Sequence, residues 1–472
     1  MKGLSSNKQF YFFVFLITLF GAIIRLVNIN YSSLWADELY SALLANPKNS
    51  WYEVLYLQRA YQPPFYTFAL WVWVKIFTYN SFYIRLFSVL TGSLSIVLTA
   101  IFGKKIKGNQ LGLLLGVLVA FNPTQIWYSL EARFYVFIYL FSLLSFWIYW
   151  IINERNKITY IQIIAKGFVD AVLCYLHHFG IILVFSQFLF ELYNYRRNKN
   201  KKELFRKSIS YIIAFLLYLP WVLWGLTEGI KVNQYWLKEI DVPAYFFFSF
   251  GYPTLINYLF LFFVLYFIYF SCKYKRTELY ILPIIVLFAV LLPLVFSFIR
   301  FPILVDRYSM VMAPMLYLMA LLGYINFNSS PVFLKTSYIS KVTTILILIV
   351  LIYPGVKLTL IDRKPLEKQP WREMAEWISK QPDFATTNVY TQGAFVKKEL
   401  NINFYFQENK KAKHLSELSE LKDKKMYLVE TNSVWKINDS VMNRIDSFFL
   451  VKKIEFQSGS ENFGNIYICT SK

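Results

Sequence analysis

The chain has 472 residues, with 49 Lys and Arg against 28 Asp and Glu, which gives a formal net charge of +21. Hydrophobic residues make up 57% of the sequence, aromatic residues 20%, and the mean hydropathy is +0.42. This composition argues against a single water-soluble globule. Apolar runs of about 18 or more residues, long enough to cross a bilayer as helices, recur between Phe10 and Ile361. We therefore expect an α-helical polytopic membrane protein.

The positive charge is unevenly distributed along the chain. Residues 362–472 hold 18 basic and 15 acidic residues, whereas residues 1–361 hold 31 basic and 13 acidic residues, mostly in short loops. Such loops follow the positive-inside rule of membrane proteins. They lack the basic, aromatic-interleaved surface of a nucleic-acid-binding protein, so we expect no nucleic-acid partner. The three cysteines are far apart and form no CxxC motif, which argues against a disulfide framework or a thiolate metal site.

The first apolar run, residues 10–27, predicts an uncleaved membrane helix with its N-terminus in the cytoplasm. The following segment, 28–81, contains the apolar run 63–77. Whether this run crosses the membrane decides the topology of the rest of the chain. If 63–77 crossed the membrane, every later basic loop would face outward. The rule of positive inner loops therefore predicts a juxtamembrane helix at 63–77 and eleven spans in total. The predicted spans are 10–27, 82–102, 109–125, 132–152, 158–175, 179–195, 208–226, 253–271, 279–298, 309–326 and 341–361.

We expect the protein to lie in the plasma (inner) membrane and to have two domains. Residues 1–361 form the membrane domain, with 28–81 as its first outer loop, and residues 362–472 form a small extracytoplasmic α/β domain. In the latter, 370–378 has the spacing of a helix. Its five short apolar runs read as strands, namely 387–391, 402–406, 425–430, 448–456 and 465–469. Most polar residues without a structural role then collect on the outer face.

Two adjacent carboxylates, Asp37 and Glu38, follow the first span in the sequence Ser33-Leu34-Trp35-Ala36-Asp37-Glu38. Ionisable groups at a membrane boundary are costly unless they have a function, so both are candidate catalytic residues. A plainer alternative is that Asp37 caps a short interfacial helix that begins at Glu38.

Several arginines accompany these carboxylates on the predicted outer face. Arg85, Arg133, Arg300 and Arg307 all lie near outer helix ends, and a guanidinium matches phosphate oxygens in a bidentate way. The alternative for each arginine alone is that it reaches toward lipid headgroups. His177 and His178 could hydrogen-bond a sugar or a phosphate, or be interfacial polar residues. One base with several cations suits transfer of a sugar that already carries a phosphate leaving group.

Other chemistries find little support in the sequence. It contains no GxGxxG, no P-loop and no DxD pair for a metal–nucleotide complex, and its three histidines make a zinc triad improbable.

Taken in order, several motifs resemble the GT-C glycosyltransferases of the protein O-mannosyltransferase-like family, which includes bacterial aminoarabinose transferases. The first is the Asp-Glu pair, preceded by Arg25. The others are Gln62-Pro63-Pro64-Phe65-Tyr66, Arg85-Leu86-Phe87-Ser88, Asn122-Pro123, Tyr128-Ser129-Leu130-Glu131-Ala132-Arg133-Phe134-Tyr135, Leu176-His177-His178-Phe179, Asp306-Arg307-Tyr308 and Trp371-Arg372-Glu373.

The resemblance implies a GT-C fold and an inverting hexosyl- or pentosyltransferase. Its donor would be a monosaccharide on a polyprenyl phosphate of the undecaprenyl type, and its acceptor an extracytoplasmic hydroxyl on glycan, lipid or protein. Asp37 would be the base, with Glu38 orienting it, and Arg85, Arg133 and Arg307 would contact the donor phosphate. The substrate-binding residues would be Gln62, Tyr128, Glu131, Tyr135, His177, His178, Asp306 and Tyr308.

Two departures from the family follow from the same comparison. Gln62 replaces the usual histidine of the His-Pro-Pro motif, which puts a phosphate or metal role at this position in doubt. Some relatives hold a divalent cation, so a cation is possible, but no matching Glu/His pair is clear and we assign no metal ligand.

A glycolipid transporter or flippase is the alternative function, because it would share the many spans and an anionic-lipid site. We expect no charged side chain at mid-depth in the spans and find no inverted repeat, and both points favour an enzyme over alternating access. A polytopic scaffold with a sensor domain would leave the Asp-Glu pair and the arginines unexplained.

Overall fold

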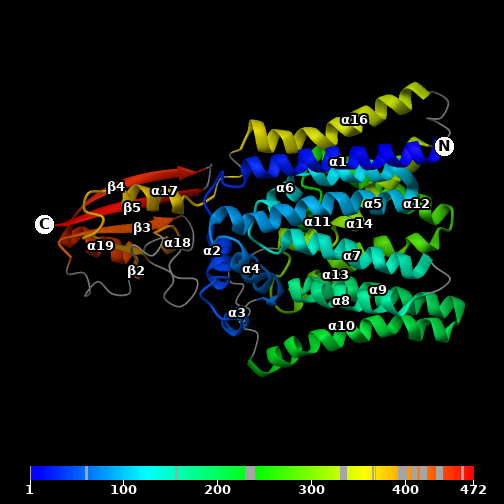
Figure 1. Cartoon of the computed structure of the whole chain (residues 1–472), viewed down its shortest axis with the longest axis horizontal. Helices are drawn as coiled ribbons and strands as arrows, with labels where there is room; N and C mark the ends of the chain where they lie inside the picture. Colours follow the sequence, from blue (N-terminus) through cyan, green and yellow to red (C-terminus); the bar gives the residue numbers. More distant parts are fainter. Residues whose placement is uncertain are drawn as a thin grey trace.

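The computed structural model describes residues 2–58, 62–154, 158–228, 240–329, 337–363, 366, 368–391, 402–406, 412–414, 423–431, 439–458 and 462–472. A long helical bundle occupies one side of the molecule, and a small sheet with its helices lies beyond one end of the bundle (Figure 1). The mostly helical membrane fold expected from the sequence is therefore confirmed, together with a small C-terminal sheet.

The bundle is built from helices that correspond to the predicted spans. Among the described residues, seven helices are long and apolar enough to cross a membrane. The number of crossings stays a prediction, since α8, α9 and α14 do not meet the same criteria and α5 contains two helical segments. The long helices are α1 (Lys2–Asn28), α5 (Ser81–Phe121), α7 (Tyr135–Glu154), α8 (Tyr160–Leu176), α9 (Phe179–Asn198), α10 (Lys201–Glu228), α12 (Thr254–Lys273), α13 (Ile281–Ile299), α14 (Ala313–Asn328) and α16 (Ser337–Val356).

Short helical elements connect these long helices. They are α2 (Ala36–Leu44), α3 (Trp51–Gln58), α4 (Phe65–Ile76), α6 (Pro123–Ser129), α11 (Val242–Phe248), the 3-10 helices η1 (Thr277–Leu279) and η2 (Asp306–Val311), and the π-helix η3 (Lys357–Ile361). The run 63–77 forms the 12-residue helix α4. At 1.5 Å per residue such a helix is about 18 Å long, too short for a usual span. It packs on the bundle through the buried Leu70 and Val74.

Helix α5 doubles back on itself near its middle. Lys107 and Gly108 have non-helical backbone angles, and Gly108 has a φ of 82°, a conformation that glycine adopts without steric cost. The two halves pack closely, because a Cβ atom added at Gly112 would lie 2.6 Å from the carbonyl oxygen of Ala100. Helix α5 therefore corresponds to two predicted spans.

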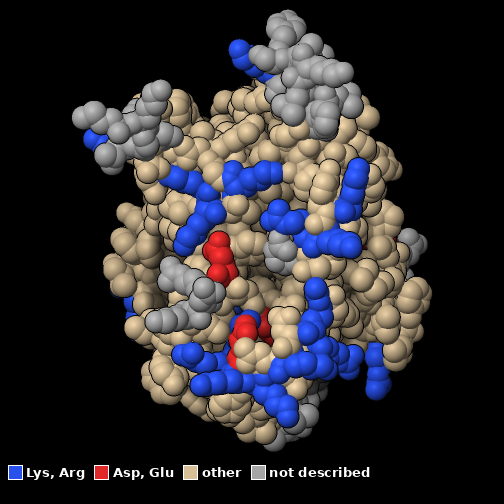
Figure 2. Space-filling model, turned by 90° about the vertical axis from the view of Figure 1, so that its right-hand side faces the viewer, with Lys and Arg blue, Asp and Glu red and all other residues tan. Residues whose placement is uncertain are grey.

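Basic loops gather at the end of the bundle that holds the N-terminus (Figure 2). Three hydrogen bonds agree with this placement of the loops. Lys104 donates to Asn7, Lys107 to Asn326, and Lys207 to Asn153. Exposed basic residues of the same loops include Lys105, Arg196, Arg197, Lys273 and Arg276. The predicted basic residues Arg155, Lys157 and Lys335 lie outside the described residues.

One expectation about the bundle is wrong. Lys166 and Asp170 lie one turn apart in α8, are both fully buried and form an ion pair. Asp170 also accepts a hydrogen bond from Ser145 of α7. Charged residues therefore do occur within a predicted span, tolerated because each neutralises the other. The absence of such charges no longer argues against a transporter.

The C-terminal sheet has the strand order β2-β1-β3-β5-β4. Strand β1 is parallel to β2 and β3, with Val389 opposite Tyr427, whereas β5 is antiparallel to β3 and β4, with Tyr427 opposite Ile468. The strands are β1 (Asn388–Thr391), β2 (Lys413–His414), β3 (Lys425–Thr431), β4 (Phe449–Ser458) and β5 (Asn462–Ser471), and the helices are α17 (Trp371–Ser379), α18 (Asn403–Phe406) and α19 (Asp439–Phe448).

The helix predicted at 370–378 is confirmed as α17, and four of the five predicted strands are present as β1, β3, β4 and β5. The run 402–406 was expected to be a strand and instead contains the short helix α18. Ile402 and Phe406 are both buried. Residues four apart share one face of a helix, so this turn buries both ends of the run at once.

Candidate active site

The Asp-Glu pair lies in the first turn of α2, at the end of the bundle that faces the sheet (Figure 1). The helix begins at Ala36 after the N-cap residue Trp35, and the Glu38 carboxylate accepts the backbone N–H of Trp35 at 3.2 Å. The alternative that Asp37 caps a helix beginning at Glu38 is therefore wrong. Glu38 supports the helix start instead, and the Asp37 side chain is left for another use.

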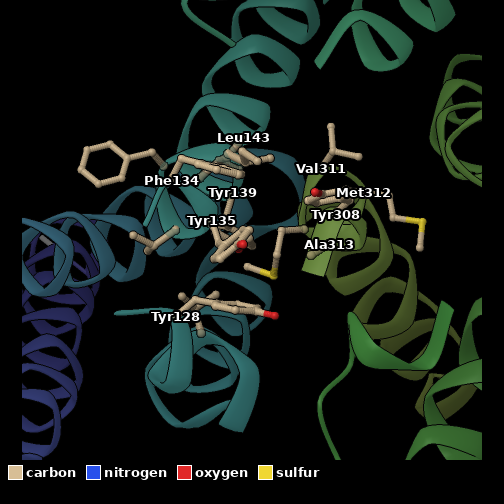
Figure 3. Packing of buried hydrophobic residues seen from close by; sticks show 14 of the residues in the cluster. Tyr128, Phe134, Tyr135, Tyr139, Leu143, Tyr308, Val311, Met312 and Ala313 are labelled. Atoms are coloured by element: carbon tan, nitrogen blue, oxygen red, sulfur yellow. The ribbon is translucent and has the colours of Figure 1, made fainter. Parts of the chain in front are cut away.

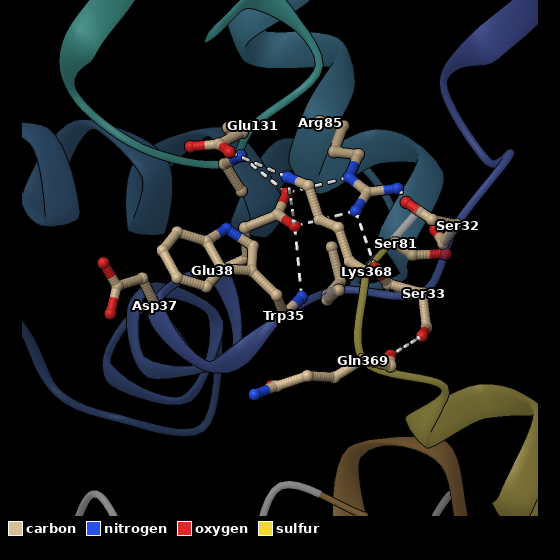
Figure 4. A network of polar contacts seen from close by, with 12 residues as sticks. Ser32, Ser33, Trp35, Asp37, Glu38, Ser81, Arg85, Glu131, Lys368 and Gln369 are labelled. Carbon is tan, nitrogen blue, oxygen red and sulfur yellow. Dashed lines mark hydrogen bonds and ion pairs between the residues drawn. The ribbon is translucent and has the colours of Figure 1, made fainter. Parts of the chain in front are cut away.

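Glu38 is fully buried in a dense polar cluster (Figure 4). Its carboxylate accepts two hydrogen bonds from Arg85, at 2.8 and 2.7 Å, and one from the backbone N–H of Ala132 at 2.9 Å, and Lys368 Nζ lies 3.4 Å away. Burial alone would raise the pKa of Glu38, but the charges of Arg85 and Lys368 and these hydrogen bonds lower it from 4.5 to about 2. Glu38 is thus a permanently ionised anchor for α2.

Arg85 does not fit the predicted contact with phosphate. Its guanidinium donates to both oxygens of Glu38 and to the backbone carbonyls of Ile29, Ser32 and Ser33, at 2.7 to 2.9 Å. These bonds occupy all five N–H donors of an arginine. Arg85 therefore fixes the loop that precedes α2, and we assign it this positioning role.

Asp37 points away from this cluster (Figure 4). Its side chain is 24% exposed, and its Oδ2 atom lies 4.0 Å from Nη2 of Arg133 and 3.8 Å from Nη2 of Arg307. Both distances are long for direct charged hydrogen bonds, which are about 2.7–2.9 Å. One carboxylate thus faces two cations without being tied tightly to either.

Arg133 is held in place by α2 and by Gln62, which precedes α4 in the chain. It donates to Ser41 Oγ at 3.1 Å, to the backbone carbonyl of Asp37 at 3.4 Å and to Gln62 Oε1 at 3.1 Å. Gln62, the first residue of the Gln-Pro-Pro motif, therefore orients an arginine of the site. The neutral amide oxygen of glutamine can make this contact at any pH.

Figure 3 shows a cluster of aromatic rings that includes Tyr128, Tyr135 and Tyr308, and two arginines lie against this cluster. Tyr128 and Tyr135 lie with ring centroids 4.6 Å apart, and both Arg133 and Arg307 lie 5.9 Å from the centroid of Tyr135. Such contacts between a guanidinium and a ring help to hold the cation in place. Tyr128 is buried, and burial raises its pKa well above 10.0, so its hydroxyl stays protonated.

His177 and His178 lie between α8 and α9. The ring of His177 lies 4.1 Å from that of Tyr308 and stacks on Phe134 at 5.2 Å, and its Nδ1 atom accepts the backbone N–H of Phe179. Burial lowers the pKa of His177 well below 6.5 and that of His178 to about 4. Both rings are therefore neutral near pH 7. His178 bonds the hydroxyl of Tyr218, on the side of α10.

The remaining predicted residues fall into two places. Glu131 is buried beside Glu38, where its carboxylate accepts hydrogen bonds from Trp127 Nε1 at 2.8 Å and Lys368 Nζ at 2.9 Å. Asp306 begins η2 next to Arg307, and burial, with the charge of Asp241, raises its pKa above 3.8. Arg300 is exposed at the end of α13 and is not part of this cluster.

Lys368 was not singled out from the sequence. It precedes α17 in the C-terminal region and shows no local motif, so only the folded chain reveals its contact with both buried carboxylates.

The charges divide into an inner and an outer set. In the inner set, Glu38 and Glu131 balance Arg85 and Lys368. In the outer set, Asp37 faces Arg133 and Arg307, and Asp306 lies next to Arg307. Within the described part of the chain, no group of three or more His, Cys, Asp or Glu is arranged to hold a metal ion. The arrangement offers one carboxylate beside two guanidinium groups.

Comparisons with known proteins agree with this description. Residues 61–224 match the family model of dolichyl-phosphate-mannose-protein mannosyltransferases. No curated protein matches the sequence. The fold is similar to ArnT from Cupriavidus metallidurans bound to undecaprenyl phosphate, with a TM-score of 0.59 and 11% identity over 96% of this chain and 97% of that one. The apo structure of the same protein gives a TM-score of 0.60 and 10% identity over the same shares.

The matched family segment contains eight of the predicted site residues, from Gln62 to His178, but not Asp37, Glu38 or Asp306–Tyr308. The structural match covers nearly the whole of both chains. The resemblance to GT-C glycosyltransferases that the motifs indicate is confirmed by the family model and by the fold.

Proposed function

We propose that this chain is an inverting glycosyltransferase that moves a monosaccharide from a polyprenyl phosphate of the undecaprenyl type to an extracytoplasmic hydroxyl. The observation that carries the proposal is the position of Asp37, whose carboxylate lies 4.0 Å from Arg133 and 3.8 Å from Arg307. A sugar phosphate bound to the two guanidinium groups would place the leaving group against two cations and the incoming hydroxyl near a base.

In this mechanism Asp37 takes the proton of the acceptor hydroxyl. The acceptor oxygen forms a bond to the anomeric carbon on the face opposite the phosphate, and the bond from that carbon to the phosphate oxygen breaks. The polyprenyl phosphate leaves with the bonding electron pair, and Arg133 and Arg307 stabilise its added charge. Glu38 and Arg85 hold α2 so that Asp37 faces the reacting atoms.

The donor assignment is supported by the chemistry around the site. The outer set brings two guanidinium groups together beside Asp37, and such groups match phosphate oxygens in a bidentate way. The similar ArnT fold has been seen with undecaprenyl phosphate bound. An apolar hollow of about 400 Å³ begins two residues beyond Gln62 and suits the hydrocarbon of such a lipid. It is lined by Leu55, Pro64, Phe65, Phe68, Tyr175, Pro220, Trp221 and Trp224.

We propose that the membrane domain (1–361) crosses the plasma (inner) membrane eleven times, with its active site and residues 362–472 outside. The basic loops lie at the end of the bundle remote from Asp37, which is the distribution expected for a cytoplasmic end (Figure 2). The test below identifies the class of acceptor, which is a glycan, a lipid or a protein.

The test compares envelope glycans, lipids and glycoproteins by mass spectrometry in strains that carry the wild type, Asp37→Asn or the exposed control Asp362→Asn. We expect Asp37→Asn alone to lose one hexose- or pentose-sized mass from one acceptor class. Near-normal transfer by Asp37→Asn would show that Asp37 is not the catalytic base. Unchanged glycans together with donor lipid retained on the cytoplasmic face would instead support the flippase alternative.

A further inference from the structure

The C-terminal region reaches into the cluster behind the catalytic helix. Lys368, just before α17, is 9% exposed, and its ammonium lies 2.9 Å from Glu131 Oε1 and 3.4 Å from Glu38 Oε2 (Figure 4). It also lies over the rings of Trp35 and Trp127, at 5.6 and 6.0 Å. A flexible lysine is thus fixed between two carboxylates that belong to different parts of the membrane domain.

Neighbouring contacts tie the same region to the loop before Asp37. Ser33 Oγ donates to the backbone carbonyl of Gln369, and the side-chain oxygen of Gln369 accepts the backbone N–H of Ala36 at 3.3 Å. The hydroxyl of Tyr405, on α18, accepts the backbone N–H of Leu34 at 2.6 Å. Two side chains that are far away in the sequence therefore accept hydrogen bonds from backbone N–H groups of the segment that leads into α2.

The charge balance makes Lys368 more than a packing residue. Glu38 and Glu131 are both almost completely buried, and the pair would carry two negative charges against the single positive charge of Arg85 if Lys368 were absent. Breaking a buried ion pair by removal of one partner is strongly unfavourable, because a charge is left without compensation. Glu38 immediately follows Asp37, so strain or movement at Glu38 is transmitted to the proposed base.

We infer that Lys368 is a positioning residue of the active site, which compensates the buried pair Glu38 and Glu131 and thereby holds Asp37 toward the substrate. The C-terminal domain is then a structural part of the catalytic machinery. This inference rests on the proposed transferase function, since Asp37 is the group whose position is at stake.

The experiment measures sugar transfer and undecaprenyl phosphate binding for the purified full chain in lipid nanodiscs. The acceptor is the class identified by the mass spectrometry described above. The variants are Lys368→Met, Lys368→Arg, Glu131→Gln and the double variant Lys368→Met/Glu131→Gln. We expect Lys368→Met to lower kcat at least 30-fold while the dissociation constant of undecaprenyl phosphate changes less than fivefold, because Arg133 and Arg307 remain.

Two comparisons separate charge compensation from simple packing. Lys368→Arg keeps the charge and should retain most of the activity. The double variant removes one positive and one negative charge together and should recover at least tenfold over Lys368→Met. If the single variant does not fold, the double variant is compared with Glu131→Gln alone, and the two should have similar kcat values. A double variant as inactive as Lys368→Met, or far below Glu131→Gln, would overturn the inference.

The same data distinguish this inference from the proposed function. Suppose that the wild type transfers sugar, that Asp37→Asn does not, and that Lys368→Met transfers as well as the wild type. The proposed transferase function would then stand, and Lys368 would have no positioning role. Absence of any transfer by the wild type would contradict the proposed function itself.

Discussion

The Nη2 atom of Arg307, in the 3-10 helix η2, lies 3.8 Å from the Oδ2 atom of Asp37, in the first turn of α2. The two residues come from opposite parts of the membrane domain and meet at the end of the bundle that faces the sheet. Arg133 lies 4.0 Å from the same oxygen atom. Two guanidinium groups thus meet at one carboxylate, and a guanidinium is well suited to contact phosphate oxygens.

Arg307→Gln is expected to weaken binding of undecaprenyl phosphate by about 10- to 100-fold, since a hydrogen bond to a charged group contributes about 1.5–3 kcal/mol. Binding is measured by fluorescence titration of the purified protein. Arg300→Gln is the matched control, because Arg300 is an exposed arginine outside the cluster. Equal affinities for the Arg307 variant and the wild type would rule out Arg307 as a phosphate ligand.

Arg85→Met is expected to destabilise the protein by about 3–5 kcal/mol, because it leaves the buried carboxylate of Glu38 without its main partner. The measurement is the thermal unfolding temperature in detergent. Lys425→Met breaks the more exposed pair with Asp383 and should cost about 1 kcal/mol or less. A phosphate-binding role for Arg85 would predict the reverse, namely weaker donor binding with little change in stability.

Much of this architecture is readable from the sequence. Long apolar runs and basic loops predict the helical bundle, because membrane insertion depends on composition over about 20 residues. The Asp37-Glu38 pair stands out because two acidic residues are adjacent nowhere else in residues 1–361, and α17 stands out because its apolar residues repeat with a helical period.

The finer assignments depend on contacts between distant residues. Nothing in the sequence around Arg85 shows that its five donors are already used, whereas Arg133 and Arg307 face Asp37. Lys368 is ordinary in its local context and acquires its partners only when the C-terminal region packs on α2. The run 402–406 is too short for its periodicity to separate a strand from a helix, so tertiary burial decides it.

Acidification is expected to destabilise the protein through His177. Its pKa is well below 6.5 in the folded chain because the ring is buried, whereas the unfolded chain has an ordinary value near 6.5. Below about pH 6.5 the unfolded state takes up a proton that the folded state does not. The free energy of unfolding therefore falls as the pH decreases, by up to about 1.4 kcal/mol per pH unit for one histidine.

The check is the unfolding temperature at pH 7.5, 6.5 and 5.5 for the wild type and His177→Gln. The unfolding temperature of His177→Gln should fall less between pH 6.5 and 5.5 than that of the wild type, whatever the stability of the variant at pH 7.5. Identical pH slopes for the two proteins would contradict a neutral, buried His177.

The apolar hollow gives the last prediction. Phe68 of α4 lines it together with Trp221 of α10, and the hollow begins close to Gln62, which bonds the phosphate-site residue Arg133. If the hollow holds the first isoprenoid units of the donor, a carboxylate placed there would face hydrocarbon without a partner. Phe68→Asp should then weaken undecaprenyl phosphate binding at least tenfold, whereas Phe68→Leu should keep affinity within about threefold, since it conserves an apolar wall.

Phe20→Asp is the control for this pair, because Phe20 is 56% exposed on α1 and does not line the hollow. Binding of undecaprenyl phosphate is measured for all three variants in nanodiscs, with unfolding temperatures to confirm that each is folded. Comparable affinities for Phe68→Asp and Phe20→Asp would mean that the isoprenoid chain leaves the site by another route. A loss confined to Phe68→Asp would place the lipid chain between α4 and α10, on the side where Gln62 orients Arg133 toward Asp37.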